Sequence, residues 1–199
     1  MHQNLLMLQA TPPDARTAAS STAPAAAGTA TGSLSQVPRE HLQGFKQVYT
    51  QFADTVFGPG NLSQAAIDNM AASMVEAGHV YTYEAPATRA QQAQPSSDAG
   101  SGKGNDSSTG ASEWQPACVM AFAPVTTDVC RIVMVWVSPS KRSQGLGTAA
   151  VKRLCSLLAQ QYSTILIIQD ESNPAAGKAY TKAGFKHAAR LGMLKRSME

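Results

Sequence analysis

The chain has 199 residues, enough for one ordinary domain or two very small ones. Charged residues make up 15% of it and hydrophobic residues 43%, yet the mean hydropathy is slightly negative, at −0.17, because alanine supplies many of the apolar residues. No apolar run approaches the roughly 18 residues that a membrane-spanning helix needs. The net charge of +3 comes from scattered basic residues rather than from a basic stripe interleaved with aromatics. We therefore expect neither a membrane nor a nucleic acid as the partner.

The cysteines indicate the redox environment. Cys118, Cys130 and Cys155 each lie inside an apolar run, and none forms a CxxC pair. This pattern predicts buried free thiols in a reducing, cytoplasmic compartment rather than a disulfide framework or a zinc site. No metal is expected.

Two segments contain almost no large apolar residues, namely 10–36 and 85–113. Such segments cannot offset the entropy cost of ordering, so both are predicted to be disordered inserts. Without them, about 140 residues remain, a common size for a single domain. Segment 10–36 is also poor in acidic residues, as organellar transit peptides are, but its only basic residue is Arg16. A disordered insert is therefore favoured over a targeting signal.

The N-terminal half begins with the apolar run Asn4–Gln9, which predicts a first strand within 1–9. From Arg39 to Phe57, apolar residues recur on one face of a helix. A second helix follows, for which Asn61 and Gln64 form a capping-box pattern and Gly78 is the stop signal.

The second half alternates strands and helices. The expected elements are strands over His79–Glu84, Ala117–Ala123, Val129–Val137, Thr164–Ile168 and Phe185–Lys195, and helices over Leu146–Gln161 and Pro174–Ala183. The order β-α-α-β-β-β-α-β-α-β predicts an α/β (α+β) fold. Its mixed central sheet has an antiparallel N-terminal half, which passes into a βαβ crossover. The wholly apolar Thr164–Ile168 is expected to be central and parallel to a neighbour.

The segment Val135–Ala149 predicts an anion site. A strand ends at Val137, a polar loop carries Lys141 and Arg142, and a glycine-rich stretch then opens a helix. The first N–H groups of a helix lack intrahelical partners, and the helix dipole adds positive charge there. A pyrophosphate would be well held at this point.

Two nucleotide-binding motifs fit this segment poorly. A P-loop needs a Lys-Ser/Thr pair after the last glycine, and none follows Gly147. A dinucleotide-binding fold would use Gly145, Gly147 and Ala150, with Asp170 at the end of the next strand. However, residues 138–144 separate the strand from the first glycine. Too few residues follow Asp170 to complete a doubly wound sheet.

The loop Arg142–Gly147 instead resembles motif A of the GNAT superfamily of acyl-CoA-dependent N-acetyltransferases, whose pattern is R/Q-x-x-G-x-G/A. Downstream, Asn173–Phe185 resembles motif B, N-x-x-A-x-x-x-Y-x-K-x-G-F, at every defined position. The resemblance covers His79–Phe185 around the second insert. Within the superfamily, the chain is similar to a subgroup whose members are known only as predicted acetyltransferases. It implies a GNAT domain over 37–199 that transfers an acetyl group from acetyl-CoA to a primary amine in a ternary complex.

The resemblance also implies roles for particular residues. Acyl-CoA would lie between two strands that splay after a β-bulge, and backbone groups of Val135 and Val137 would pair with it. Backbone N–H groups of the motif A loop would bind the pyrophosphate, namely those of Arg142, Ser143, Gln144, Gly145, Leu146, Gly147 and Thr148. Tyr180 would be the general acid that protonates the CoA thiolate. Asn173 would bind the pantetheine arm, cap the helix that begins at Pro174, or do both.

The general base and the acceptor are not identified by the sequence. Many family members carry a Glu on the fourth strand, but Val129–Val137 has no carboxylate, and Glu84 and Asp170 are candidates only through water. The alternative function is therefore a catalytically silent acyl-CoA-binding sensor or interaction module. Trp136 is out of phase with its neighbours, so it is read either as core under a helix or as a pocket wall.

The acceptor could be a small-molecule or a peptide amine. In many relatives a further strand closes the acceptor site, whereas 14 residues follow Phe185 here. A homodimer partner could complete the site. His79 and His187 are read as solvated or structural residues at element ends.

Overall fold

The computed structural model of the chain describes residues 3–10, 32–85 and 114–193. Its elements are β1 (Gln3–Ala10), β2 (Ser33–Gln36), η1 (Arg39–His41), α1 (Leu42–Phe57), α2 (Gln64–Glu76), β3 (Val80–Glu84), β4 (Cys118–Pro124), β5 (Val129–Val137), η2 (Pro139–Lys141), α3 (Leu146–Leu158), β6 (Thr164–Asp170), α4 (Pro174–Lys182) and β7 (Lys186–Met193). The predicted order of helices and strands is confirmed, with β2 and two short 3-10 turns in addition.

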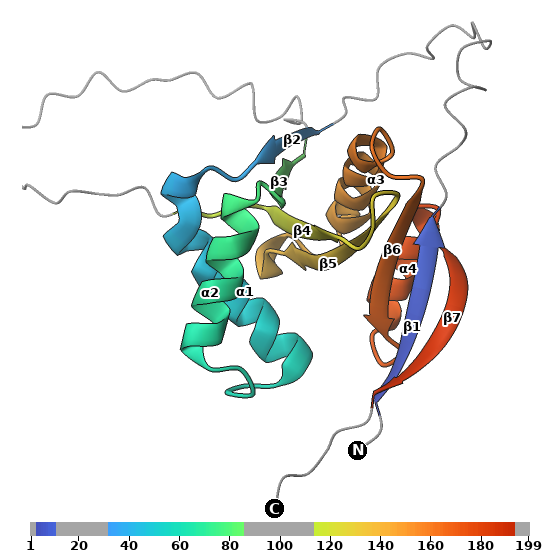
Figure 1. The fold of residues 1–199 in the computed structure, drawn as a ribbon, viewed down its shortest axis with the longest axis horizontal. Coiled ribbons are helices and arrows are strands. Elements are labelled where there is room, and N and C mark those ends of the chain that lie inside the picture. Colours follow the sequence, from blue (N-terminus) through green and yellow to red (C-terminus); the bar gives the residue numbers. More distant parts are fainter. Residues whose placement is uncertain (1–2, 11–31, 86–113, 194–199) are drawn as a thin grey trace, which may run out of the picture.

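The strands form one mixed sheet in the order β2-β3-β4-β5-β6-β1-β7 (Figure 1). Among the described strands only β5 and β6 pair in parallel, and the helix between them, α3, makes the predicted crossover. The remaining neighbours pair antiparallel. The expected mixed α/β architecture, with an antiparallel half followed by a βαβ unit, is therefore confirmed.

Helices cover both faces of the central strands, so the molecule has two core clusters. On one face α3 packs on the sheet through Leu154, beside Ile132 and Ile165. On the other face α1 and α2 pack through Phe45 and other apolar side chains. Figure 1 shows α1 and α2 on the opposite side of β4 and β5 from α3. Because β4 lies between the two layers, its residues from Cys118 to Phe122 are all buried, which explains its unbroken apolar run.

The first strand occupies an unexpected place in the sheet. β1 lies between β6 and β7 and pairs antiparallel with both (Figure 1). Leu8, for example, lies opposite Ile167 on one side and His187 on the other. The strand itself is confirmed, and it is the neighbour of both β6 and β7.

The predicted disorder of 10–36 is wrong at both of its ends. Ala10 belongs to β1, and Ser33–Gln36 forms the edge strand β2, where Leu34 lies opposite Tyr83 of β3. This polar segment forms a strand because backbone pairing with β3 holds it, while Leu34 packs toward the α3 core. Residues 11–31 and 86–113 lie outside the described residues, so their predicted disorder stays a prediction.

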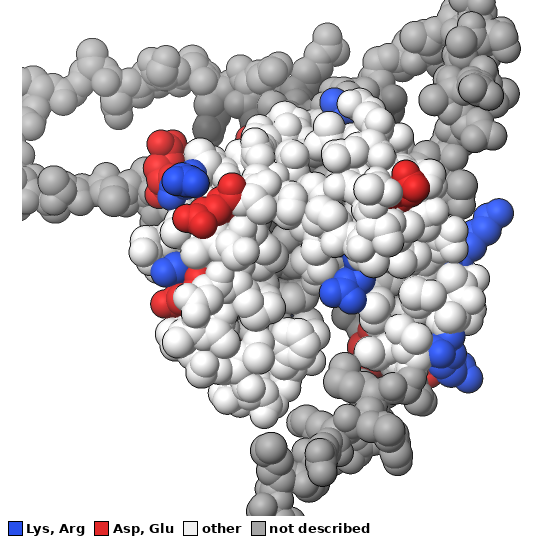
Figure 2. Space-filling model, viewed as in Figure 1, with Lys and Arg blue, Asp and Glu red and all other residues white. Residues whose placement is uncertain are grey.

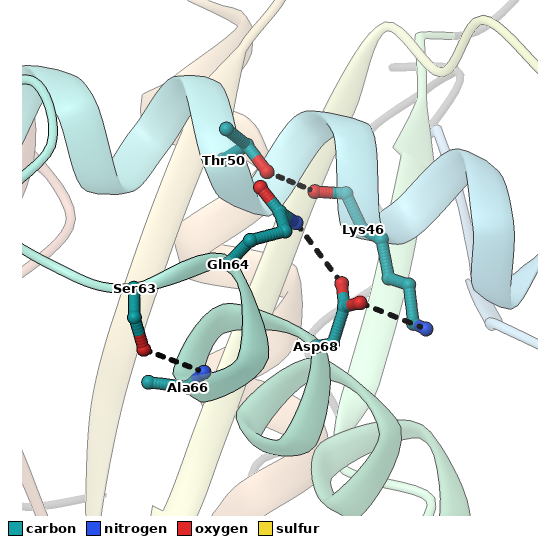
Figure 3. A network of polar contacts seen from close by, with 6 residues as sticks. All are labelled: Lys46, Thr50, Ser63, Gln64, Ala66 and Asp68. Carbon is teal, nitrogen blue, oxygen red and sulfur yellow. Dashed lines mark hydrogen bonds and ion pairs between the residues drawn. The ribbon is translucent and has the colours of Figure 1, made fainter.

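The predicted cap of the second helix is also wrong. Ser63 is the N-cap, and its hydroxyl oxygen accepts a hydrogen bond from the Ala66 N–H at 3.2 Å (Figure 3). The Asn61 side chain instead donates to the carbonyl of Phe57, at the end of α1. Asn61 lies in the turn after Gly58, too early in the chain to reach the first N–H groups of α2.

Polar side chains connect α1 to α2. Asp68 accepts a hydrogen bond from Gln64 at 3.0 Å and forms an ion pair with Lys46 at 3.7 Å (Figure 3). Both groups are partly exposed, so the ion pair contributes little to stability. Across the face shown in Figure 2, charged side chains are scattered rather than gathered into one patch.

Candidate functional site

The two parallel strands separate at their carboxyl ends. The pairs between β5 and β6 run from Val129↔Thr164 to Ile132↔Ile167 and stop there. β5 continues to Val137, whereas β6 continues to Asp170 paired only with β1. The two strand ends therefore border a gap in the described sheet.

A β-bulge marks the point of separation. In the ladder between β4 and β5, Ala121 lies opposite Met134 and Phe122 opposite Ile132, so Val133 is the extra residue. The bulge shifts the side-chain alternation by one residue. Ile132 faces the α3 core before the bulge, and Val135 faces it afterwards. The bulge that the resemblance implied for this strand is thus present, immediately after the last pair with β6.

Trp136 consequently faces the opposite side of the sheet from Val135 and Val137. It packs, partly buried, against the cluster beneath α1 and α2. This position agrees with the interpretation of Trp136 as core under a helix.

The backbone of the free end of β5 is directed toward the gap. The Ser138 N–H donates to the carbonyl of Ala117 on the β4 side, at 3.0 Å. Successive residues of a strand direct their N–H and C=O groups to opposite sides. The polar backbone groups of Val137 and Val135 therefore point away from β4, toward the gap. The Val137 carbonyl also accepts a hydrogen bond from Nε of Arg142 at 3.2 Å.

The loop between β5 and α3 presents N–H donors at one end of this gap. Ser143 and Gly145 have left-handed backbones, with φ of 62° and 78°, and α3 begins at Leu146. The first hydrogen bond of the helix runs from the Ala149 N–H to the Gly145 carbonyl, at 3.1 Å. The N–H groups of the three residues before Ala149 therefore have no partner within the helix.

Two details refine the predicted donor set. The backbone N–H of Arg142 already donates to the Pro139 carbonyl, at 3.4 Å, so its side chain is the better candidate for contacting an anion. Gly147 lies against the strand end, because a Cβ there would lie 3.4 Å from Cγ2 of Val137. The start of α3 and the end of β5 are thus in close contact.

Tyr180 lies on α4, partly buried, with its ring centroid 6.3 Å from that of Phe185. Burial, and to a lesser extent the nearby thiol of Cys118, raises the pKa of Tyr180 to about 12. The phenol therefore keeps its proton at neutral pH. This is the state that a general acid requires.

Asn173 caps α4. Its Oδ1 accepts a hydrogen bond from the Ala176 N–H at 3.1 Å, and Pro174 takes the first helical position. The predicted cap is confirmed, and the side-chain NH₂ retains two donors that could reach a ligand. Asn173, Gly177 and Tyr180 are spaced i, i+4, i+7, so they share one face of α4.

Gln169 was not among the residues predicted from the sequence, and it lies on β6 beyond the last pair with β5. Its Oε1 is buried and makes no hydrogen bond among the described residues. Its amide lies against α4 at Gly177, where a Cβ would come within 2.8 Å of Nε2. The only signal in the sequence was a polar residue directly after the apolar run of β6.

The two candidate bases lie in different places. Asp170 ends β6 beside the gap, and its Oδ1 accepts a hydrogen bond from the Ser172 N–H at 2.8 Å. Glu84 is exposed on β3, opposite Ser33 of β2, and β4 separates it from β5. The structure brings Asp170, but not Glu84, to the gap.

His79 and the three cysteines also have pKa values that depart from their ordinary ones. The His79 ring packs at a tilt against that of Phe122, with centroids 4.6 Å apart, and burial lowers the pKa of His79. Burial raises the pKa of Cys118 and Cys155 to about 12 and that of Cys130 to about 11, and all three are free thiols. Among the described residues, no group of three or more His, Cys, Asp or Glu is arranged to hold a metal ion. No helix in the described part of the chain has the length and apolar character to cross a membrane.

Comparison with known proteins agrees with this geometry. Residues 110–185 match the sequence model of the family described as "Acetyltransferase (GNAT) family". Among solved structures, the fold is similar to that of a GNAT-family acetyltransferase from Colwellia psychrerythraea, with a TM-score of 0.60 and 17% identity over 96% of this chain and 55% of that one. It is also similar to a GCN5-related N-acetyltransferase from Sphaerobacter thermophilus, with a TM-score of 0.57 and 12% identity over 94% of this chain and 49% of that one.

These two solved chains are longer, and the present chain spans about half of their length. At such identities the similarity concerns the fold. No curated protein matches the sequence.

Proposed function

We propose that the chain, which matches the GNAT acetyltransferase family over residues 110–185, is an acyltransferase that moves the acetyl group of acetyl-CoA to a primary amine. The observation that supports this best is the gap between β5 and β6. Backbone groups of β5 that no longer pair with β6 border it, and N–H groups of α3 without a partner in the helix lie at its end. An extended acyl-pantetheine arm can pair with β5 as an added strand does. Its pyrophosphate can bind at the helix N-terminus.

The residues present fit acetyl-CoA as a co-substrate. The loop from Arg142 to Thr148 is exposed apart from the start of the helix, and it combines N–H donors with the Arg142 guanidinium. A backbone N–H of β5 would polarise the thioester carbonyl and stabilise the oxyanion. One such donor is worth about 3 kcal/mol.

In the proposed step, the amine nitrogen forms a bond to the acetyl carbon, and the bond from that carbon to sulfur breaks. Tyr180 gives its proton to the departing sulfur. The amine loses one proton to water, either before or after the attack. No dedicated base is proposed, because β5 carries no carboxylate and Asp170 already accepts the Ser172 N–H. The acceptor is an amine on a small molecule or a peptide.

The absence of a carboxylate on β5 also favours one alternative, an acyl-CoA-binding module without turnover. A homodimer, whose partner subunit would complete the acceptor site, is also part of the proposal.

Calorimetry with acetyl-CoA, together with a thiol-release assay on a panel of amines, tests the proposal. We expect binding, and turnover with at least one amine that Tyr180→Phe reduces by 10²-fold or more. Binding without turnover on any amine would favour the module. A protein that does not bind acetyl-CoA would contradict both functions.

A further inference from the structure

Gln169 has an unusual environment for a polar side chain. Its Oε1 is buried and has no hydrogen-bond partner among the described residues. Leaving a buried carbonyl oxygen unpaired costs roughly 1–3 kcal/mol, so such groups are rare in folded proteins and call for an explanation.

The position of Gln169 relates it to the gap. β6 pairs with β5 only as far as Ile167, and beyond this point only β1 accompanies β6, with Leu6 opposite Gln169. The side chains of Ile165, Ile167 and Gln169 alternate with those that face the other way, so Gln169 points to the same side as the α3 core. It therefore lies where β5 has left the sheet, with α4 packed against it.

Gly177 makes room for the Gln169 amide. A Cβ at Gly177 would lie 2.8 Å from Nε2 and 3.1 Å from Oε1, so any larger residue would displace the amide. Gly177 shares its face of α4 with Tyr180, three residues on, or about 4.5 Å along the helix axis. The orphaned oxygen thus lies about one helical turn from the proposed acid.

The chemistry of the oxygen selects its partner. A carbonyl oxygen only accepts hydrogen bonds. The phosphates, the thioester carbonyl and the sulfur of acetyl-CoA are all acceptors, so none of them can satisfy it. The pantetheine arm, however, contains two secondary amides with N–H donors, and two methylene groups separate the nearer amide from the sulfur. An arm that ran along α4 from Tyr180 toward Asn173, with its sulfur at Tyr180, would bring that amide beside Gly177.

We propose that Oε1 of Gln169 accepts a hydrogen bond from the pantetheine amide nearest the sulfur and so positions the thioester at Tyr180. This inference rests on the proposed binding of acetyl-CoA. Gln169 is a positioning residue, because it touches the arm and not the reacting atoms.

The test compares two ligands in calorimetric titrations without an amine. Acetyl-CoA has the arm, whereas adenosine 3′,5′-bisphosphate has only the nucleotide phosphates. Gln169→Met keeps the length of the side chain and removes the oxygen. This substitution should lower the affinity for acetyl-CoA about five- to tenfold and leave the affinity for the bisphosphate unchanged. The melting temperature of the free variant should not fall, since no hydrogen bond of the free protein is lost. The control is Gln47→Met on the exposed side of α1, which should change neither affinity.

Gly177→Ala provides a second, independent variant. The added methyl group should displace the Gln169 amide. It should lower the affinity for acetyl-CoA but not that for the bisphosphate. In a Gln169→Ala background the same change should have no further effect on acetyl-CoA, because the displaced group is gone.

Several results would overturn the inference. Unchanged affinity of Gln169→Met for acetyl-CoA would exclude the contact. Equal weakening of the binding of both ligands would make Gln169 a support of the fold. Wild-type protein that binds neither ligand would instead contradict the proposed function itself, and this inference with it.

Discussion

Nε of Arg142 donates a hydrogen bond to the carbonyl oxygen of Val137 at 3.2 Å. This contact joins the start of the glycine-rich loop to the end of β5. One side chain thus holds the loop proposed to bind the pyrophosphate beside the strand that would pair with the arm.

Arg142→Ala should lower the affinity for acetyl-CoA about tenfold or more. It removes both the hydrogen bond to Val137 and a positive charge beside the proposed pyrophosphate site. Isothermal titration at two salt concentrations measures the effect, which should be smaller at high salt. Arg153→Ala removes an exposed arginine of α3 away from the loop and serves as the control. Equal loss in both variants would contradict a specific role for Arg142.

Gly145 has a φ of 78°, and no atom lies within 4 Å of the position that its Cβ would take. Gly145→Ala should therefore introduce backbone strain of about 1 kcal/mol without a clash. Gly60 offers a matched control, since its φ is 73° and its surroundings are equally open. Urea unfolding should show similar losses for both variants, whereas only Gly145→Ala should weaken acetyl-CoA. A loop that binds phosphate through its backbone predicts this difference, and equal affinities would contradict it.

The pKa of Tyr180, raised to about 12 by burial, predicts the alkaline side of the activity profile. A general acid must be protonated, and this phenol keeps its proton well above pH 10. The rate should therefore rise with pH as the acceptor amine becomes neutral, and then remain level to at least pH 10. Steady-state kcat measured between pH 6 and 10 tests this expectation. A fall between pH 9 and 10 while the fold persists would exclude Tyr180 as the acid.

Burial lowers the pKa of His79 below its ordinary value of 6.5. The unfolded chain then binds a proton more readily than the folded one, so the free energy of unfolding should fall as pH drops below about 6.5. Urea denaturation at pH 7.5 and at acid pH measures the change. His79→Gln should reduce this pH dependence, whereas His187→Gln, at an exposed position on β7, should preserve it. If the free energy of unfolding depended on pH equally in both variants, His79 would not be the group responsible.

Leu8 tests the placement of β1. Its side chain is 6% exposed and belongs to the α3 core, whereas Leu5 is only partly buried. Leu8→Ala should lower the free energy of unfolding by about 2–4 kcal/mol, and Leu5→Ala by clearly less. Chemical denaturation provides both values. If both variants lost the same small amount of unfolding free energy, β1 would not pack in the sheet in solution.

Much of the site was predictable because its signals are local. Short-range spacing sets the positions of the loop glycines, of Asn173 at the start of α4 and of Tyr180 on the same face of that helix. The structure places them as this spacing indicates. The bounds of β5 were also predicted correctly, since its apolar run ends at a polar loop.

The failures have physical causes that a single sequence does not display. β2 consists of three polar residues and Leu34, and it becomes a strand through pairing with β3 rather than through its own periodicity. The partners of β1 lie near the other end of the chain, and no pattern in Asn4–Gln9 specifies them. Gln169 was missed because its environment depends on tertiary structure. Its amide contacts Gly177 of α4, and it lies beyond the point where β5 stops pairing with β6.

The position of β1 also has a consequence for biosynthesis. This strand is translated before every other described element, whereas its two neighbours, β6 and β7, follow all of the other described strands. A ribosome therefore exposes the apolar residues of β1 well before their partners exist. Pairing of β1 is then a late event made by contacts of very long sequence separation, which are slow to form. Until β6 and β7 emerge, β1 is a segment that a chaperone would have to protect.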